Sequence, residues 1–167
     1  MTLRLKTALL AAAGVLALAG QAQADDIVEA ARKAGNFTML LKAVKQAGLE
    51  AKMKTPGPFT VFAPTDAAFA ALPPDVAKRL MNPANKKELA KVLSYHVLAG
   101  RLSTRDLGET PRAADSLIGA PVVLNGMGPG TKVNDANITT PDMRVDNGVV
   151  HVIDKVLLPP MPIQPKF

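Results

Sequence analysis

The hydrophobic pattern of this chain changes its period once, near Tyr95, and this change limits the folds that the chain can adopt. Before Tyr95, apolar residues recur every three or four positions, as in residues 37–47, which is the spacing of a helix buried along one face. After Tyr95, apolar and polar residues alternate in short segments separated by turn sequences such as those at 125–126 and 147–148. Helices in the first half and strands in the second predict an α+β domain with segregated layers.

Charged and turn residues predict the ends of the helices. Acidic residues at the start of residues 25–34, basic residues at the end and Gly35 afterwards are typical of a helix that complements its own dipole. Asn36 is expected to cap a second helix over residues 37–47. Further helices are expected from a cap at Thr65 or Asp66 through 72, over 75–81, and from residue 83 onward.

The strand expectations cover most of the chain from residue 96 to residue 158. Residues 96–98 and 101–103 resemble a short hairpin. Residues 149–158 are the last expected strand, and its β-branched part, residues 149–153, is expected to lie at the centre of a sheet. The glycine-rich stretch 126–130 is interpreted as a hairpin loop rather than a phosphate cradle, because it does not open a helix. The other expected strands are 59–62, 110–114, 122–125, 131–133, 137–140 and 143–146.

The first 24 residues have the pattern of a secretory signal peptide. Arg4 and Lys6 precede an apolar run over residues 8–19, and Ala22 and Ala24 supply the small residues of an Ala-x-Ala cleavage site. The run is too short to span a bilayer, which needs roughly 20 residues. We therefore expect a periplasmic or secreted protein without a membrane span, cleaved near Ala24, with one domain over 25–159 and a proline-rich tail over 160–167.

Composition argues against several functional classes. The chain has no cysteine, which excludes disulfides, thiolate metal sites and a lipid anchor on an N-terminal cysteine. The net charge of +6 comes without a basic run interleaved with aromatic residues, so no nucleic-acid partner is expected. Lys86, Lys87 and Lys91 are interpreted as a solvated helix face, with a weak role against an acidic polysaccharide or lipid surface as the alternative.

No catalytic, metal or cofactor site is expected from the sequence. The two histidines, His96 and His151, lack the spacing of a metal-binding motif, and a core or strand-face role is favoured for both. No serine lies in a G-x-S-x-G context, and Ser94 and His96 are expected to point apart at the end of a helix. A hydrolase is therefore the third-ranked hypothesis.

Three segments, in order, resemble the fasciclin domain family. Residues 60–73 (TVFAPTDAAFAALP) and 147–159 (NGVVHVIDKVLLP) resemble the two sequence boxes of the family, and residues 93–100 (LSYHVLAG) resemble its Tyr-His segment. The resemblance covers about residues 27–159 and implies an α+β fold in which two small β-sheets form a wedge with helices packed on one side. It also implies that the strands at 60–62 and 149–153 are neighbours.

Within the resemblance, the box residues are expected to have structural roles. Asn147-Gly148 suits a tight turn that needs a positive φ. Asp66, His96 and His151 are expected to form hydrogen bonds in the core. The residues assigned to the structure of the boxes are Thr65, Asp66, Asn147, Gly148 and His151.

The family resemblance implies cell adhesion or contact with an extracellular matrix, through a cell-surface or matrix protein or a polysaccharide. In animal members, a stretch similar to residues 140–143 and the Tyr-His segment are linked to integrin binding. The candidate partner-binding residues are therefore Tyr95, His96, Pro141, Asp142 and Met143. The competing interpretation of Pro141-Asp142 is a turn before a strand.

The alternative function is a soluble carrier of an apolar small molecule such as a carotenoid or a lipid. Such a ligand would need a pocket between the helices and the sheet, lined by side chains such as Met39, Met53 or Leu98. The sequence gives no direct sign of this pocket and leaves the oligomeric state open.

Overall fold

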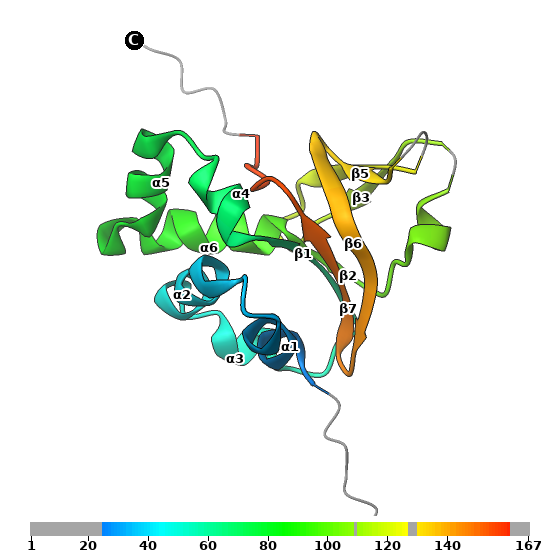
Figure 1. Cartoon of the computed structure of the whole chain (residues 1–167), viewed down its shortest axis with the longest axis horizontal. Helices are drawn as coiled ribbons and strands as arrows, with labels where there is room; N and C mark the ends of the chain where they lie inside the picture. Colours follow the sequence, from blue (N-terminus) through cyan, green and yellow to red (C-terminus); the bar gives the residue numbers. More distant parts are fainter. Residues whose placement is uncertain (1–24, 109, 127–129, 161–167) are drawn as a thin grey trace, which may run out of the picture.

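The computed structural model describes residues 25–108, 110–126 and 130–160, with helices in the first half and strands in the second (Figure 1). The expected signal peptide, residues 161–167 of the expected tail and the centre of the 126–130 loop lie outside the described residues. The elements are α1 (Ile27–Ala34), α2 (Thr38–Ala47), α3 (Glu50–Met53), β1 (Phe59–Pro64), α4 (Asp66–Ala70), α5 (Pro74–Met81), η1 (Pro83–Asn85), α6 (Lys86–Tyr95), β2 (Val97–Ala99), η2 (Thr104–Leu107), β3 (Arg112–Asp115), β4 (Pro121–Asn125), β5 (Lys132–Val133), β6 (Ala136–Val145) and β7 (Gly148–Ile153).

Seven strands are hydrogen bonded in the order β2-β1-β7-β6-β5-β4-β3. β1 and β7 pair in parallel along their whole lengths, and the other pairs are antiparallel. The expected neighbourhood of residues 60–62 and 149–153 is thus confirmed. β6 pairs with β5 near its start and with β7 over the rest, so one long strand joins the two expected small sheets.

Both faces of the central strands are buried. The α-helices lie on one side of β1, β7 and β6 (Figure 1), and a large apolar core fills the space between them. All six residues of β7 are buried, which explains why this strand has no polar alternation in the sequence. The second core lies on the other face of the sheet and consists of Phe62, Tyr95, Leu98, Leu107, Val122, Leu124, Val133, Ala136, Ile153 and Leu157.

Helix α1 ends at Ala34, as its sequence predicts, but begins at Ile27, two residues after the expected start at residue 25. The carboxylate of Asp26 accepts a hydrogen bond from the backbone N–H of Glu29 at 2.9 Å, which caps the first turn. Gly35 ends the helix in the left-handed region, with a φ of 77°. These local signals are sufficient because every group that makes them lies within one turn of the helix.

Helix α2 is capped from a distant part of the chain, and the expectation that Asn36 caps it is wrong. The residue at the cap position is Phe37, whose side chain makes no capping bond. Instead, Asp66 Oδ1 accepts a hydrogen bond from Met39 N–H at 2.7 Å, and the N–H of Asp66 donates to the carbonyl of Asn36 at 2.9 Å. Asp66 therefore fastens the start of α2 to α4, which Thr65 caps through Ala68 N–H.

Asn147 and Gly148 do not form the expected turn with a positive φ. Gly148 opens β7 without a positive φ, and a Cβ atom at this position would lie 1.9 Å from the carbonyl oxygen of Phe59. The glycine is therefore required by the close approach of β1 and β7. The side chain of Asn147 is buried, where it accepts from Ile27 N–H at 3.2 Å and donates to the carbonyls of Met53 and Thr55 at 2.7 and 3.1 Å.

The expected hairpin over residues 96–103 is also wrong. β2 pairs antiparallel with β1, and residues 101–103 form no strand. The N–H of Leu102 donates instead to Thr60 Oγ1 at 2.9 Å, and Thr60 Oγ1 donates to the carbonyl of Gly100 at 2.7 Å. The hydroxyl of Thr60 thus makes hydrogen bonds to residues 100 and 102 that a hairpin would have made between its own strands.

Candidate functional site

The stretch that contains Pro141 and Asp142 is a bulge within β6 rather than a turn before a strand. Thr140 lies opposite Val152 and Met143 lies opposite Val150, so that two residues of β6 face the single residue His151 of β7. The bulge gives Asp142 a φ of 55°. Proline is tolerated here because a bulge interrupts the hydrogen-bond ladder, which removes the need for an N–H.

His151 holds the bulge from inside the protein. Its side chain is completely buried and is stacked on Phe62, with 5.6 Å between the ring centroids. Nδ1 accepts a hydrogen bond from Asp142 N–H at 3.1 Å, and Nε2 lies 2.7 Å from the carbonyl oxygen of Leu102. Because a backbone N–H can only donate and a carbonyl can only accept, these partners assign the ring proton to Nε2.

Asp142 extends this contact to the segment that follows β2. Its carboxylate accepts hydrogen bonds from both the backbone N–H and the hydroxyl of Thr104. Partial burial pushes the pKa of Asp142 upward, but the hydrogen bonds from Thr104 and the positive charge of Arg144 outweigh it and hold the pKa below its usual value. Residues 100–104 are therefore held against the sheet by side chains of β1, β6 and β7.

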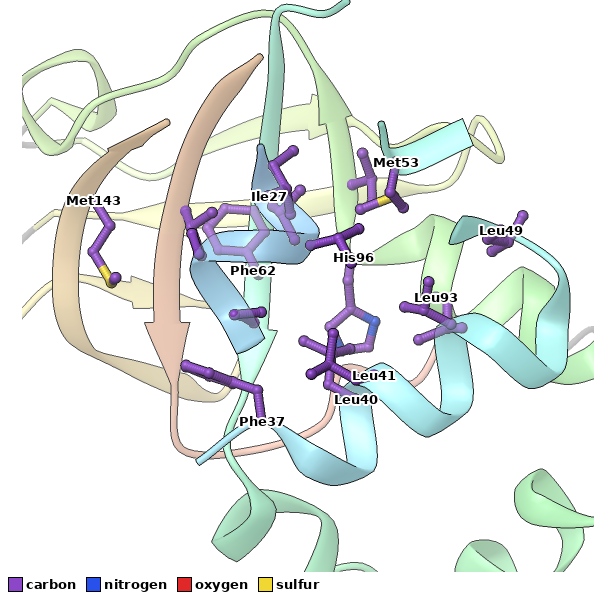
Figure 2. A pocket seen from close by; sticks show the side chains of 18 residues that line it. Ile27, Phe37, Leu40, Leu41, Leu49, Met53, Phe62, Leu93, His96 and Met143 are labelled. Atoms are coloured by element: carbon purple, nitrogen blue, oxygen red, sulfur yellow. The ribbon is translucent and has the colours of Figure 1, made fainter. Parts of the chain in front are cut away.

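The bulge brings only part of the predicted contact residues to the surface. Pro141 is exposed, whereas Asp142 and Met143 are half-buried. Met143 packs against the helix-side core, where it lines a small cavity (Figure 2). The exposed residues of this stretch, which we call the β6 contact face, are Thr139, Thr140, Pro141 and Arg144.

Tyr95 and His96 lie inside the protein, with 3% and 2% of their surfaces exposed. Tyr95 Oη donates to the carbonyl of Pro121 and accepts from Asn134 Nδ2, each at 3.0 Å. Their side chains therefore cannot contact a partner directly in this conformation. The structural hydrogen bonds of Tyr95 were missed from the sequence because both partners lie more than 20 positions away along the chain.

Both ring nitrogens of His96 are engaged. Nδ1 donates to the carbonyl of Val92 at 2.7 Å, and Nε2 accepts from Leu157 N–H at 2.9 Å. Burial of the ring, partly opposed by the bond to Val92, lowers the pKa of His96 to about 4, so the ring is neutral at pH 7. His96 therefore has no free nitrogen with which to act as a base toward Ser94.

The described residues contain no cluster of three or more side chains that could hold a metal ion. In the same part of the chain, no helix is both long enough and apolar enough to cross a membrane. Lys86, Lys87 and Lys91 of α6 are all exposed, as the interpretation of a solvated helix face predicts. Lys86 Nζ lies beside Gly48 at the end of α2, and Lys91 lies in a groove beside α5.

The space between the helices and the sheet is nearly filled. The cavity shown in Figure 2 contains about 30 Å³ of free volume, which is room for roughly two water molecules. Its walls are apolar except for His96, and among the three residues named for a carrier pocket only Met53 lines it. Met39 lies in a different surface hollow, and Leu98 belongs to the second core.

Comparison with known proteins assigns the chain to a family. The model of the fasciclin domain family matches residues 35–159. The chain belongs to the fasciclin domain family. The matched region contains both sequence boxes, which correspond to β1 with α4 and to β7, and also the segment that joins α6 to β2.

Relatives of this fasciclin domain come from bacteria and animals. Protein sll1483 of Synechocystis is 42% identical over 148 residues, which is 87% of this chain and 81% of that protein. The cell surface glycolipoprotein MPB83 of Mycobacterium bovis is 38% identical over 104 residues, or 62% of this chain and 45% of the relative. A FAS1 domain pair from the insect cell adhesion molecule Fasciclin I has the same fold, with a TM-score of 0.62, 19% identity, and coverage of 80% of this chain and 50% of that chain.

Proposed function

We propose that this fasciclin domain is an exported, non-catalytic adhesion module that contacts a cell-surface or matrix polymer through the β6 contact face. The observation that carries the proposal is the bulge at Asp142, which presents exposed side chains on a backbone that His151 and Thr104 fix from behind. A contact surface that is rigid before binding loses little conformational entropy when the partner binds.

The descriptions of two similar proteins, as a surface protein and as an adhesion protein, support this proposal. MPB83 is described as a cell surface glycolipoprotein, and the insect protein as a cell adhesion molecule. An exported protein is also what the sequence of residues 1–24 predicts. The chemistry of the β6 contact face, with the hydroxyl of Thr140 and the cation of Arg144, suits an acidic or hydroxyl-rich polymer.

An apolar carrier receives less support. The cavity of about 30 Å³ is far smaller than the roughly 300–1,000 Å³ of common ligand pockets, so a carotenoid could not enter it without moving the helix layer. We therefore favour surface contact over transport of a ligand within the core.

The test is attachment of the native host after deletion of the gene, followed by complementation with surface variants. Deletion should lower attachment to a solid surface, and the wild-type gene should restore it. Complementation with Arg144→Glu or Pro141→Asp should not restore attachment, although both proteins should be exported and should unfold at the wild-type temperature.

The matched control is Lys87→Glu, which reverses an exposed charge on α6, in the helix layer and not on β6. This variant should restore attachment fully. Normal attachment of the deletion strain, or equal loss with all three variants, would contradict the proposed role of the β6 contact face.

A further inference from the structure

A groove along α5 exposes apolar side chains beside the helices and shares no residue with the β6 contact face. Three large apolar side chains of the described residues are exposed, and two of them, Ile118 and Leu158, line this groove. Single exposed apolar residues are common on protein surfaces, but two that converge on one hollow indicate a binding surface. We call the hollow the α5 groove; it is lined by Val76, Arg79, Leu80, Glu88, Lys91, Val92, Ile118, Leu158, Pro159 and Pro160.

The α5 groove has the size and the floor of a small-ligand site. Its volume is about 630 Å³, within the roughly 300–1,000 Å³ that is usual for such sites. Leu80 and Val92 form a buried apolar floor, with 2% and 5% of their surfaces exposed. α5 and α6 lie side by side, and the described chain ends beside them (Figure 1).

Hydrogen bonds fix the backbone next to the two exposed apolar residues before any ligand binds. Ile118 is carried by a tight turn, in which Gly119 N–H donates to the carbonyl of Ser116 at 2.8 Å and Leu117 N–H donates to that of Val97 at 2.9 Å. Leu158 follows Leu157, whose N–H is bound to His96. Groups that are fixed in the free protein lower the entropic cost of binding.

The polar groups of the groove leave one positive charge available. Arg79 forms an ion pair with Glu88, so these two charges offset each other. Lys91 is exposed and forms an ion pair with no acidic side chain of the described residues. A ligand that matches this groove therefore combines an apolar body with one negative charge.

The backbone of the walls favours an acyl chain over an extended peptide. Within α5 and α6, the N–H and C=O groups of the helix interior bond to each other, and Pro159 and Pro160 have no N–H. An extended peptide would lose hydrogen bonds to water and find few replacements here. An acyl chain has no such bonds to lose.

We propose that the α5 groove binds a single-chain fatty acid, with the acyl chain against Leu80, Ile118 and Leu158 and the carboxylate near Lys91. This site is independent of the proposed adhesive role of β6. It also differs from the core cavity, because it needs no movement of the helix layer.

The experiment is fluorescence titration of the purified protein with cis-parinaric acid below its micellar concentration. Wild-type protein should bind the probe saturably with one site per chain. Dodecanoate should displace the probe at least roughly fivefold better than dodecanol, because the two competitors share a chain length and differ in charge. Equal displacement by the two competitors would overturn the role of Lys91.

Variants then locate the site. Ile118→Asp should weaken probe binding about tenfold or more, since it places a charge in the apolar wall. Lys91→Glu should weaken the binding of dodecanoate but should leave the binding of dodecanol unchanged. The matched control is Val123→Asp, because Val123 is the third exposed apolar side chain and lies on β4, outside the groove.

All of these substitutions are at exposed positions, so the folded state should persist, and the melting temperature without probe checks this for each variant. Absence of saturable binding by the wild-type protein would overturn the proposal. Equal weakening by Val123→Asp and Ile118→Asp would overturn the location of the site.

Discussion

His151 Nδ1 accepts a hydrogen bond from the backbone N–H of Asp142 at 3.1 Å, which joins a buried residue of β7 to the exposed bulge of β6. The same ring reaches the carbonyl of Leu102 through Nε2. The imidazole of His151 therefore positions the backbone of two neighbouring segments, at Asp142 and at Leu102. The buried histidine of the second sequence box and the predicted contact stretch thus form one structural unit.

Replacement of His151 tests this unit. His151→Ala leaves the N–H of Asp142 and the carbonyl of Leu102 without their partner and removes the ring that stacks on Phe62. We expect a loss of ~1–3 kcal/mol in the free energy of unfolding and a melting temperature lower by several degrees, measured by circular dichroism. An unchanged melting temperature with lost attachment would assign His151 a direct functional role instead.

Gly148→Ala tests the close approach of β1 and β7. The new Cβ atom would lie 1.9 Å from the carbonyl oxygen of Phe59, so the parallel strands would have to separate. We expect a loss on the order of 2–4 kcal/mol in urea unfolding. Gly130→Ala is the control, since its new Cβ atom would have no described neighbour within 4 Å and the variant should unfold like the wild type.

Substitutions of Asn147 test how the N-terminal helices are attached to the sheet. Asn147→Asp replaces an amide donor by a carboxylate that faces the carbonyls of Met53 and Thr55. At pH 7 this variant should be less stable than Asn147→Ala, itself lower than wild type by on the order of 2 kcal/mol.

The introduced carboxylate is disfavoured in its charged form, so its pKa in the folded state is raised and protonation should recover stability as the pH falls. The difference in the free energy of unfolding between Asn147→Asp and Asn147→Ala, measured by urea unfolding, should therefore decrease toward pH 4. A gap that does not depend on pH would contradict the buried contact of Asn147 with these two carbonyls.

The lowered pKa of His96 predicts how the free energy of unfolding depends on pH. The pKa of His96 is lowered from 6.5 to about 4 in the folded protein, so the unfolded chain binds a proton that the folded chain does not. Stability is therefore fully present above about pH 6.5 and falls as the pH is lowered toward 4, by roughly 3 kcal/mol in total.

The measurement for His96 is urea unfolding between pH 4.5 and 7. His96→Asn, which removes the titrating group, should be less stable at pH 7 and should lose most of the pH dependence in this range. The aspartates with lowered pKa values, Asp106, Asp142 and Asp154, change stability only at lower pH, because their stabilising effect is lost as the pH falls through these lowered pKa values. If the free energy of unfolding of His96→Asn depended on pH as steeply as that of the wild type, the pH dependence could not be assigned to His96.

Errors of the sequence-based prediction occur where a side chain bonds to a distant backbone group. Asp66 caps α2 in place of Asn36, and Thr60 takes the partner role that was expected of a second hairpin strand. Thr60 and Thr104 were not singled out at all, because their partners lie about 40 positions away and no local pattern marks them. Local signals predict which groups need partners, but they do not identify partners brought close only by folding.

The sequence by itself determined the α+β class, the C-terminal end of α1 and the resemblance to the fasciclin family, and that resemblance implied that β1 and β7 are neighbours. These follow from hydrophobic period, from caps within one helical turn and from the two boxes, all of which are written in consecutive residues. Only the tertiary structure decided that Pro141 and Asp142 form a bulge, that Tyr95 and His96 are buried, and that Ile118, Leu158 and Lys91 share a groove. The physical reason is that burial and exposure depend on the packing of segments that are far apart in the chain.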